Sequence, residues 1–231
     1  MDYQTQMKIR RALRKPLVTY LFLAMQIVAF LLMTLDGGST SIETLVRYGA
    51  KFNPLIVLGQ WWRLITPMFL HIGVVHLIMN SVILYYLGAQ LEAVFGHWRY
   101  FVLYFFGGIA GNAASFAFSE SVSAGASTAL FGLFGSTLVL AKLYRGNPAI
   151  QIMSRNFSLL ILLNLLFGLF STQVDLAGHM GGLAGGYLLS YVLTTPVVRF
   201  KLTQRRAVFG LLYIGLLIVL IVIGVGNYIW W

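Results

Sequence analysis

Long apolar stretches alternate with short polar connections along this chain. Each stretch approaches the roughly 20 residues that a helix needs to cross a bilayer. The stretches are 17–35, 74–95, 98–118, 127–143, 156–171, 176–194 and 208–226. The fourth and fifth are shorter than the others. The pattern predicts an all-α membrane protein with seven transmembrane helices.

Composition supports a lipid environment. Hydrophobic residues make up 59% of the chain and charged residues only 10%, whereas soluble domains carry about 25% charged residues. A soluble core of this size cannot bury so much apolar surface. The absence of cysteine excludes a disulfide framework and thiolate chemistry. The first apolar run is too long for a signal peptide, so we expect no cleavable leader.

Lysine and arginine predict the orientation, because they gather in cytoplasmic connections. With a cytoplasmic N-terminus, all basic residues except Arg47, Lys51 and Arg63 fall on the inner side. The net charge of +10 is then a topology signal with some attraction to anionic lipid, and we expect no nucleic-acid partner. The C-terminus is expected outside, and the expected location is the plasma membrane of a bacterium.

The segments divide the chain into three parts. We predict a basic cytoplasmic N-terminus over 1–16, a six-helix core over 17–195, and a basic linker with a seventh helix over 196–231. The seventh segment has no candidate catalytic residue, which suggests a helix appended to the core. The apolar and aromatic connection 36–73 is expected in or on the outer leaflet. We find no inverted repeat of the kind that transporters use.

Four polar residues stand out in the apolar segments, where such groups are costly and usually functional. His76 and Asn80 are four residues apart and share one helix face. Ser127 begins the fourth segment, and His179 lies near the start of the sixth. At 1.5 Å per residue, Ser127, His179 and Asn80 each lie roughly 22 Å from the cytoplasmic end of their segment, with His76 one turn further out. All four are therefore expected at one depth, near the outer face.

These residue types suit acyl transfer. A serine hydroxyl is a weak nucleophile until a base takes its proton, and His179 is the candidate base for Ser127. The side chains of His76 and Asn80 and the backbone N–H of Ser127 are candidate donors to an oxyanion. Water must reach this site, so a cavity open to the outside is expected. The chain before Ser127 then has to dip into the membrane. Irregular backbone is tolerated there only when it is buried inside protein or lies beside water.

Small residues accompany both candidate catalytic groups. Gly182 and Gly186 follow His179 at i+3 and i+7, and such spacings let helix backbones approach closely. A direct Ser–His hydrogen bond between two helices needs this approach. Phe131 follows Ser127 by one turn and is placed to lie against the His179 ring.

Simpler interpretations exist for single residues. A lone serine in a span usually bonds to its own helix, and glycines alone indicate ordinary packing. His71 and His97 are interpreted as structural, and Glu92 as a tie between helices. Asp175 is either a third triad member that orients the imidazole or an acid at a helix start. Arg63 is expected to cap or anchor the long connection.

Other hydrolase signatures do not fit. A nucleophile elbow reads G-x-S-x-G, and the last position here is Ala129. No HExxH motif is found, and histidine and carboxylate groups do not occur at spacings that predict a metal site.

The motifs, in this order, resemble those of rhomboid intramembrane serine proteases over roughly residues 55–190, and weakly over the first segment. The matching positions are Trp62 and Arg63 of a Trp-Arg motif, His76 and Asn80 of His-x-x-x-Asn, Glu92 at the end of the second segment, Gly125 and Ser127 of Gly-x-Ser, and His179, Gly182 and Gly186 of His-x-x-Gly-x-x-x-Gly.

The resemblance implies a six-plus-one helix fold and a Ser–His dyad of Ser127 and His179, without an acid, metal or cofactor. It implies cleavage of transmembrane segments of other proteins near the extracytoplasmic face, through an acyl-enzyme. The partners would be those substrates and the bilayer, and the oligomeric state stays open. Two positions depart from the family pattern. Thr128 replaces a usual glycine and is expected close to the nucleophile, where it would narrow the pocket or slow turnover, and Phe131 replaces a common tyrosine.

Two other functions are weighed against proteolysis. A non-catalytic rhomboid-superfamily chaperone or dislocation factor keeps the Trp-Arg loop but lacks the Ser–His pair, so Ser127 and His179 count against it. A transporter or channel would line its pathway with the polar cluster, but the chain shows neither repeats nor paired intramembrane charges.

Overall fold

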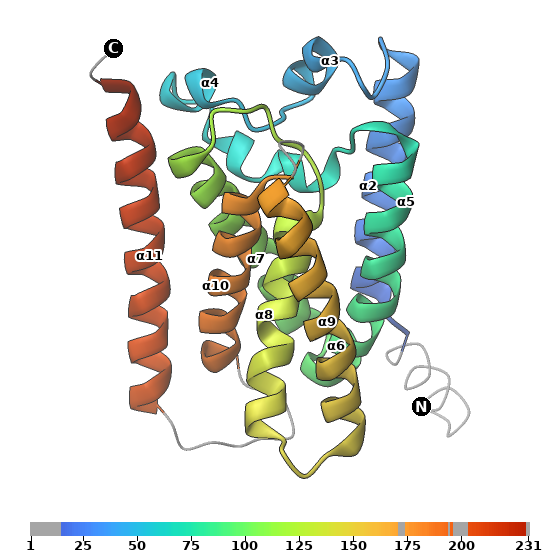
Figure 1. Cartoon of the computed structure of the whole chain (residues 1–231), viewed down its shortest axis with the longest axis vertical. Coiled ribbons are helices and arrows are strands. Elements are labelled where there is room, and N and C mark those ends of the chain that lie inside the picture. Colours follow the sequence, from blue (N-terminus) through green and yellow to red (C-terminus); the bar gives the residue numbers. More distant parts are fainter. Residues whose placement is uncertain (1–14, 171–173, 194, 196–202, 230–231) are drawn as a thin grey trace, which may run out of the picture.

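A computed structural model describes residues 15–170, 174–193, 195 and 203–229. The seven predicted segments all form helices (Figure 1). They are α2 (Leu17–Leu35), the continuous run of α5 (Gly73–Ile83), η3 (Leu84–Gly88) and α6 (Ala89–Phe95), α7 (His97–Phe118), α8 (Ser127–Leu143), α9 (Pro148–Phe170), α10 (Leu176–Val192) and α11 (Thr203–Ile229). The predicted ends at 171 and 194, most of the basic N-terminus and the start of the linker lie outside the described residues.

Five of these helices are long and apolar enough to cross a membrane: α2, the run Gly73–Phe95, α7, α9 and α11. The helices α8 and α10 are shorter, with 17 residues each. The chain is therefore a helical, multi-pass membrane protein, and seven spans stay a prediction.

The helix α9 is longer than predicted, because it begins at Pro148 rather than at 156. The side chain of Asn147 accepts the backbone N–H groups of Ala149 and Ile150 at 3.1 and 3.3 Å. Asparagine as N-cap followed by proline starts a helix well. The side chain of Gln151 donates to carbonyl groups at the end of α8. These hydrogen bonds stabilise the first turns of α9, which are polar and therefore were not predicted as part of the apolar segment.

Four short helices in the connection 36–72 cover one end of the molecule, called the upper end here (Figure 1). They are α3 (Ile42–Arg47), α4 (Asn53–Val57), η1 (Trp61–Leu64) and η2 (Thr66–Phe69). The buried Arg63 donates to the carbonyl groups of Val46 and Ala50 at 2.7 and 2.9 Å and to the Gln60 side chain at 2.7 Å. Arg63 thus anchors the connection, as predicted.

At the lower end, Glu92 ties α6 to α2. Its carboxylate accepts the backbone N–H groups of Val18 and Thr19 at 2.9 and 2.8 Å and the Thr19 hydroxyl at 2.7 Å. It also pairs with His97. A carboxylate at a helix N-terminus satisfies free N–H groups and favours the helix dipole. The predicted structural roles of Glu92 and His97 are confirmed.

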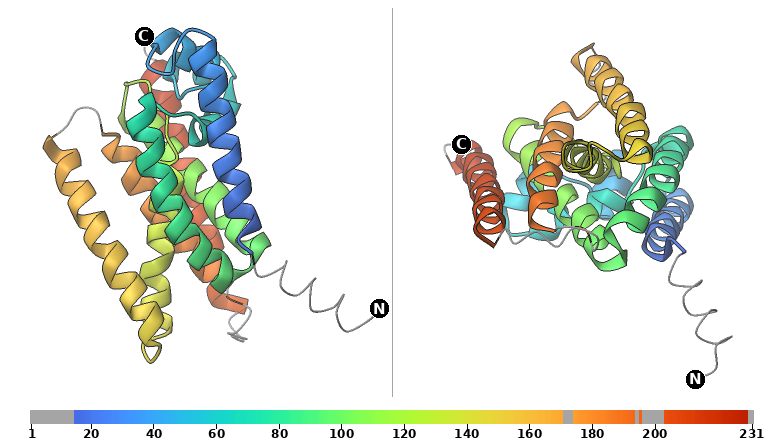
Figure 2. Two further views of the ribbon diagram at one scale, coloured as in Figure 1. Left: turned by 90° about the vertical axis from the view of Figure 1, so that its right-hand side faces the viewer. Right: turned by 90° about the horizontal axis from the view of Figure 1, so that it is seen from below.

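The centre of the molecule is a bundle of α7, α8 and α10, with α8 enclosed by its neighbours when seen from below (Figure 2). The backbones touch at glycines. A Cβ added at Gly186 would lie 1.9 Å from the Gly132 carbonyl oxygen, and one at Gly182 would lie 2.2 Å from the Thr128 carbonyl oxygen. The prediction of close approach at these two glycines is confirmed.

The helix α11 lies beside this bundle (Figure 2). The Tyr213 hydroxyl donates to the Phe106 carbonyl at 2.8 Å, and the Asn227 side chain donates to the Ala117 carbonyl at 2.9 Å. Both bonds reach α7, so α11 is attached to the side of the bundle that is remote from α2 and α5.

Lys51 joins the connection 36–72 to the loop 119–126. Its backbone forms an antiparallel bridge with Ser123, and its fully buried Nζ donates to the Ser119 carbonyl at 2.7 Å. The Asn53 side chain donates to the same oxygen at 3.0 Å. Burial lowers the pKa of Lys51 to about 8, although the nearby Asp175 and Glu120 act in the opposite direction.

Replacing Gly186 by alanine should destabilise the protein by more than about 3 kcal/mol, because the new methyl group meets backbone that cannot yield. Thermal unfolding in detergent measures the loss. Gly215→Ala is the matched control, because α11 has open space at that position, and it should leave the melting temperature unchanged or slightly raised. Equal melting temperatures for the two variants would contradict the packing described.

The buried lysine should make stability depend on pH. Because the folded-state pKa of Lys51 is about 8 against 10.5 when exposed, the unfolded chain holds more protons between these values, and folding becomes more favourable as pH rises. The rise between pH 7.5 and 9.5 should be smaller in Lys51→Met by about 2 kcal/mol. Lys142→Met, at an exposed lysine, should keep the wild-type rise in denaturant unfolding.

Candidate active site

A cavity of about 730 Å³ opens between α5, α8, α9 and the start of α10. It is lined by Ile72, His76, Met79, Asn80, Ile83, Ser119, Ser121, Val122, Ser123, Ala124, Ser127, Leu130, Phe131, Phe134, Asn164, Val174, Asp175 and His179. The four polar residues singled out in the sequence are all in this set. Helices far apart in the sequence therefore bring Ser127, His179, His76 and Asn80 to one cavity.

Ser127 is the first residue of α8 and is partly exposed to the cavity. The first hydrogen bond within the helix joins the Leu130 N–H to the Ala126 carbonyl, and no side chain caps the N-terminus. The N–H groups of the first turn thus have no partner within the helix. Together with the helix dipole they favour negative charge beside Ser127.

The loop before Ser127 is held from the side of η2. The Gly125 N–H donates to the Pro67 carbonyl at 2.9 Å, and the Ala126 N–H donates to His71 Nε2 at 3.4 Å. Gly125 has a φ of +147°, and a Cβ there would lie 2.8 Å from His76 Cε1 and 3.6 Å from Ser127 Oγ. Only glycine fits this position, between the His76 ring and the serine.

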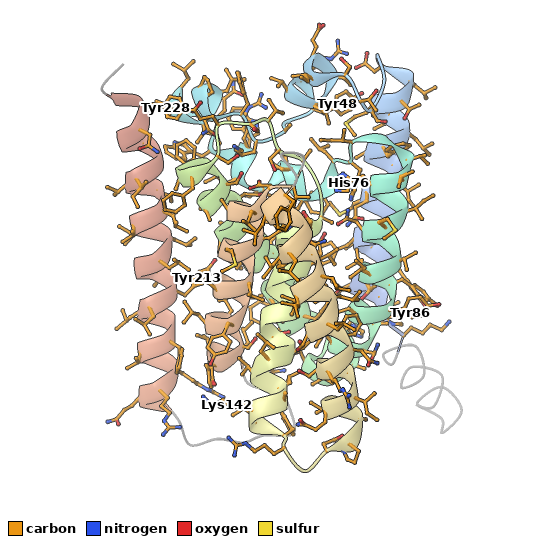
Figure 3. The ribbon with its side chains drawn as sticks, in the orientation of Figure 1. Tyr48, His76, Tyr86, Lys142, Tyr213 and Tyr228 are labelled. Carbon is orange, nitrogen blue, oxygen red and sulfur yellow. The ribbon has the colours of Figure 1, made fainter. Side chains whose placement is uncertain are left out.

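His76 projects from α5 toward the bundle (Figure 3). Its Nδ1 accepts the Ile72 N–H at 3.4 Å, so in the neutral ring the proton is on Nε2, the nitrogen next to Gly125. Asn80 donates one amide N–H to the His76 carbonyl at 2.9 Å and has a second N–H to offer. Both side chains can therefore donate a hydrogen bond into the cavity.

His179 lies in the first turn of α10 and is buried. Its ring stacks on Phe131 with centroids 4.1 Å apart and planes 8° from parallel, which confirms the predicted contact. Phe131 is one helical turn after Ser127 and shares its face of α8, so the stack holds the imidazole against the face that carries the hydroxyl. Within the described residues, no hydrogen bond joins Ser127 to His179, and the buried His179 Nδ1 has no partner.

Asp175 is the N-cap of α10, not a partner of the imidazole. Its carboxylate accepts the Gly178 N–H at 2.8 Å and the hydroxyl groups of Ser115 and Ser123 at 2.5 and 2.7 Å. Of the two roles considered for this acid, the structure favours the helix start. The same contacts link α7, the loop 119–126 and α10 directly above His179.

Thr128 does not line the cavity. Its buried side chain lies between α7 and α10, where a Cβ added at Gly111 would be 2.6 Å from Thr128 Cβ and one at Gly178 would be 3.0 Å from Thr128 Cγ2. Two glycines thus make room for the larger residue. The expectation that Thr128 narrows the pocket is not supported, because the side chain is buried in the helix interface.

Three other predicted positions are outside the cavity lining. Trp62 is half exposed at the upper end, Arg63 anchors the connection, and Glu92 lies at the lower end, sixteen residues after His76 in the same helical run. None of the three lines the cavity, and Arg63 and Glu92 hold the scaffold through the hydrogen bonds given above. Within the described part of the chain, no group of three or more histidine and acidic residues is arranged to hold a metal ion.

His71 is more closely involved than the sequence suggested. Its ring meets that of His76 edge to face, with centroids 5.2 Å apart, while Nε2 accepts the N–H next to Ser127. Burial, with the neighbouring His76 as a smaller cause, lowers the pKa of His71 to about 3, so the ring is neutral and can accept. The short spacing of five residues between His71 and His76 could have predicted that His71 lies near the candidate site.

The comparisons with known proteins identify the family of this chain. Residues 58–196 match the family model of the Rhomboid domain. The Rhomboid protease GluP of Bacillus subtilis is 44% identical over 182 residues, which are 79% of this chain and 36% of that protein. RHOMBOID-like protein 5 of Arabidopsis thaliana is 39% identical over 159 residues, 66% of this chain and 50% of that protein.

A third relative is the Rhomboid-like protease 2 of Toxoplasma gondii, 38% identical over 152 residues. That alignment covers 63% of this chain and 52% of the relative. This chain thus spans between about a third and a half of the length of these three proteins. Because the domain match covers more than half of the chain and includes every residue of the polar cluster, the chain belongs to the rhomboid family of intramembrane proteases.

Proposed function

We propose that this protein is a serine endopeptidase that cleaves transmembrane segments of other membrane proteins. The observation that carries the proposal is the single cavity lined by Ser127, His179, His76 and Asn80. The rhomboid family membership and the named proteases among the relatives support it. A membrane chaperone or dislocation factor is the weaker alternative, since it has no need of a serine and a histidine on one cavity.

The first half of the reaction forms an ester. His179 takes the proton of the Ser127 hydroxyl while the oxygen attacks the scissile carbonyl carbon. The proton then passes from His179 to the leaving amine as the peptide bond breaks, and the acyl group stays on Ser127. The two side chains share the proton once substrate is bound, because catalytic hydrogen bonds often tighten only in the complex.

The second half hydrolyses the ester. Water from the cavity loses a proton to His179, attacks the ester carbonyl, and the proton returns to the serine oxygen as it leaves. In both halves negative charge develops on the carbonyl oxygen. His76 Nε2, the free Asn80 amide N–H and the N–H groups of the first turn of α8 are the donors available to it.

The orientation follows from the charges. The basic Lys142 lies at the lower end, opposite Tyr48 and Tyr228 (Figure 3), so we assign the lower end to the cytoplasm. The cavity is then near the extracytoplasmic face of a bacterial plasma membrane. The substrate has to unwind locally there, because an intact helix uses its own amides and shields the carbonyl.

Ser127→Ala and His179→Ala should each reduce cleavage of a model transmembrane substrate in proteoliposomes by at least about 10³-fold, because the nucleophile or its base is missing. Ser136→Ala is the matched control, since this serine of α8 bonds only the Leu133 carbonyl of its own helix at 2.6 Å. The control should keep wild-type cleavage. Undiminished cleavage by Ser127→Ala would refute the proposal.

His76→Ala should lower kcat by about 10²-fold with a small change in KM, because an oxyanion donor acts in the transition state. Steady-state kinetics in detergent measures both constants. Labelling of Ser127 by a fluorophosphonate, with phosphorus in place of the tetrahedral carbon, should slow in parallel. A variant that changed KM alone would assign His76 to substrate binding instead.

A further inference from the structure

Asn164 is a polar residue that neither the sequence motifs nor the catalytic scheme uses. It lies in the last third of α9 and lines the catalytic cavity, together with Ser127 and His179. Its side chain is exposed, and it forms no hydrogen bond with any residue that the structure describes. The neighbouring positions 162 to 166 are otherwise all leucine.

The depth of Asn164 matches that of the nucleophile. The helices α8 and α9 meet in a short turn at the lower end and diverge toward the upper end (Figure 2). Ser127 lies sixteen residues before Leu143, and Asn164 lies sixteen residues after Pro148. Both are therefore about 24 Å along their helix from the shared turn. Asn164 on α9 and Ser127 on α8 therefore line the cavity at a similar height above this turn.

An unpaired carboxamide at this depth is costly. Lipid offers it no hydrogen-bond partner, and polar groups in a span are retained where they meet a partner or line a wet cavity. The cavity wall formed by α8 contributes the apolar side chains of Leu130, Phe131 and Phe134. Among the residues that the structure describes, Asn164 thus has no side-chain partner.

We propose that Asn164 is a substrate-binding residue, whose side-chain amide hydrogen bonds the backbone of the transmembrane segment lying extended across the cavity. This inference rests on the proposed function. A segment that unwinds inside the membrane exposes N–H and C=O groups that must be paired again. A carboxamide offers both a donor and an acceptor, carries no charge, and can pair with a peptide unit whatever the substrate's side chains are.

The proposed proton transfers between Ser127, His179 and the substrate do not involve Asn164. Its contribution should therefore appear in binding of a long substrate and be absent from reactions of small reagents. Asn164→Leu, which keeps the branched arrangement of side-chain heavy atoms but removes the amide, should raise KM for a transmembrane substrate roughly three- to tenfold, the value of one hydrogen bond, with kcat changed less. The rate of fluorophosphonate labelling of Ser127 should stay at the wild-type value.

Asn156→Leu provides the matched control. It is the same substitution on the same helix, two turns nearer the lower end, at an exposed residue that does not line the cavity. Its KM should equal that of the wild type. Asn164→Gln keeps the amide and should recover most of the affinity, which a merely structural role for Asn164 does not predict.

The proposal is overturned if Asn164→Leu keeps the wild-type KM. It is also overturned if the KM, the labelling rate and the melting temperature of that variant change together, because the residue would then support the fold. Ser127→Ala in the same assay separates the two levels of inference. If wild type and Ser127→Ala cleave equally, the proposed function itself fails, whereas loss of cleavage only in Ser127→Ala leaves the Asn164 comparison as the test.

Discussion

Direct contact between the backbones of α8 and α10 is the constraint on which this structure depends. Between helices in lipid no hydrophobic effect favours association, so close packing has to supply the attraction. Gly182 and Gly186 meet the carbonyl groups of Thr128 and Gly132 with no space for a side chain. This contact brings the first turns of the two helices together. The serine and the histidine are both in those first turns, so their meeting is a consequence of the packing.

The upper end then holds the serine from two sides. On one side, Pro67 and His71 bind the N–H groups of the two residues before it. On the other side, Lys51 and Asp175 bind the loop through Ser119 and Ser123. Irregular backbone in a membrane protein needs such partners, because lipid offers none. The remaining walls are formed by α5, which carries His76 and Asn80, and by the diverging α9, which carries the Asn164 amide.

Local features were predictable from the sequence because they depend on neighbours along the chain. The helices appear where the apolar segments predicted them, and the spacing of Phe131 from Ser127 anticipated its stack on His179. The start of α9 was predicted eight residues too late, since an Asn–Pro start and a side chain bonded to α8 compensate for a polar first turn. Hydropathy alone does not register such bonds.

By itself the sequence determined the class of molecule, the helical segments and the identity of the four polar residues that line the cavity, because composition and periodicity carry that information. Only the tertiary structure decided which neighbours each polar atom meets. It made Asp175 a helix cap, brought His71 to the backbone beside Ser127 and turned Thr128 away from the cavity. These outcomes depend on differences of a few tenths of an ångström in the spacing between helices. That spacing is set by the side-chain volumes of three helices together and by no single segment of the chain.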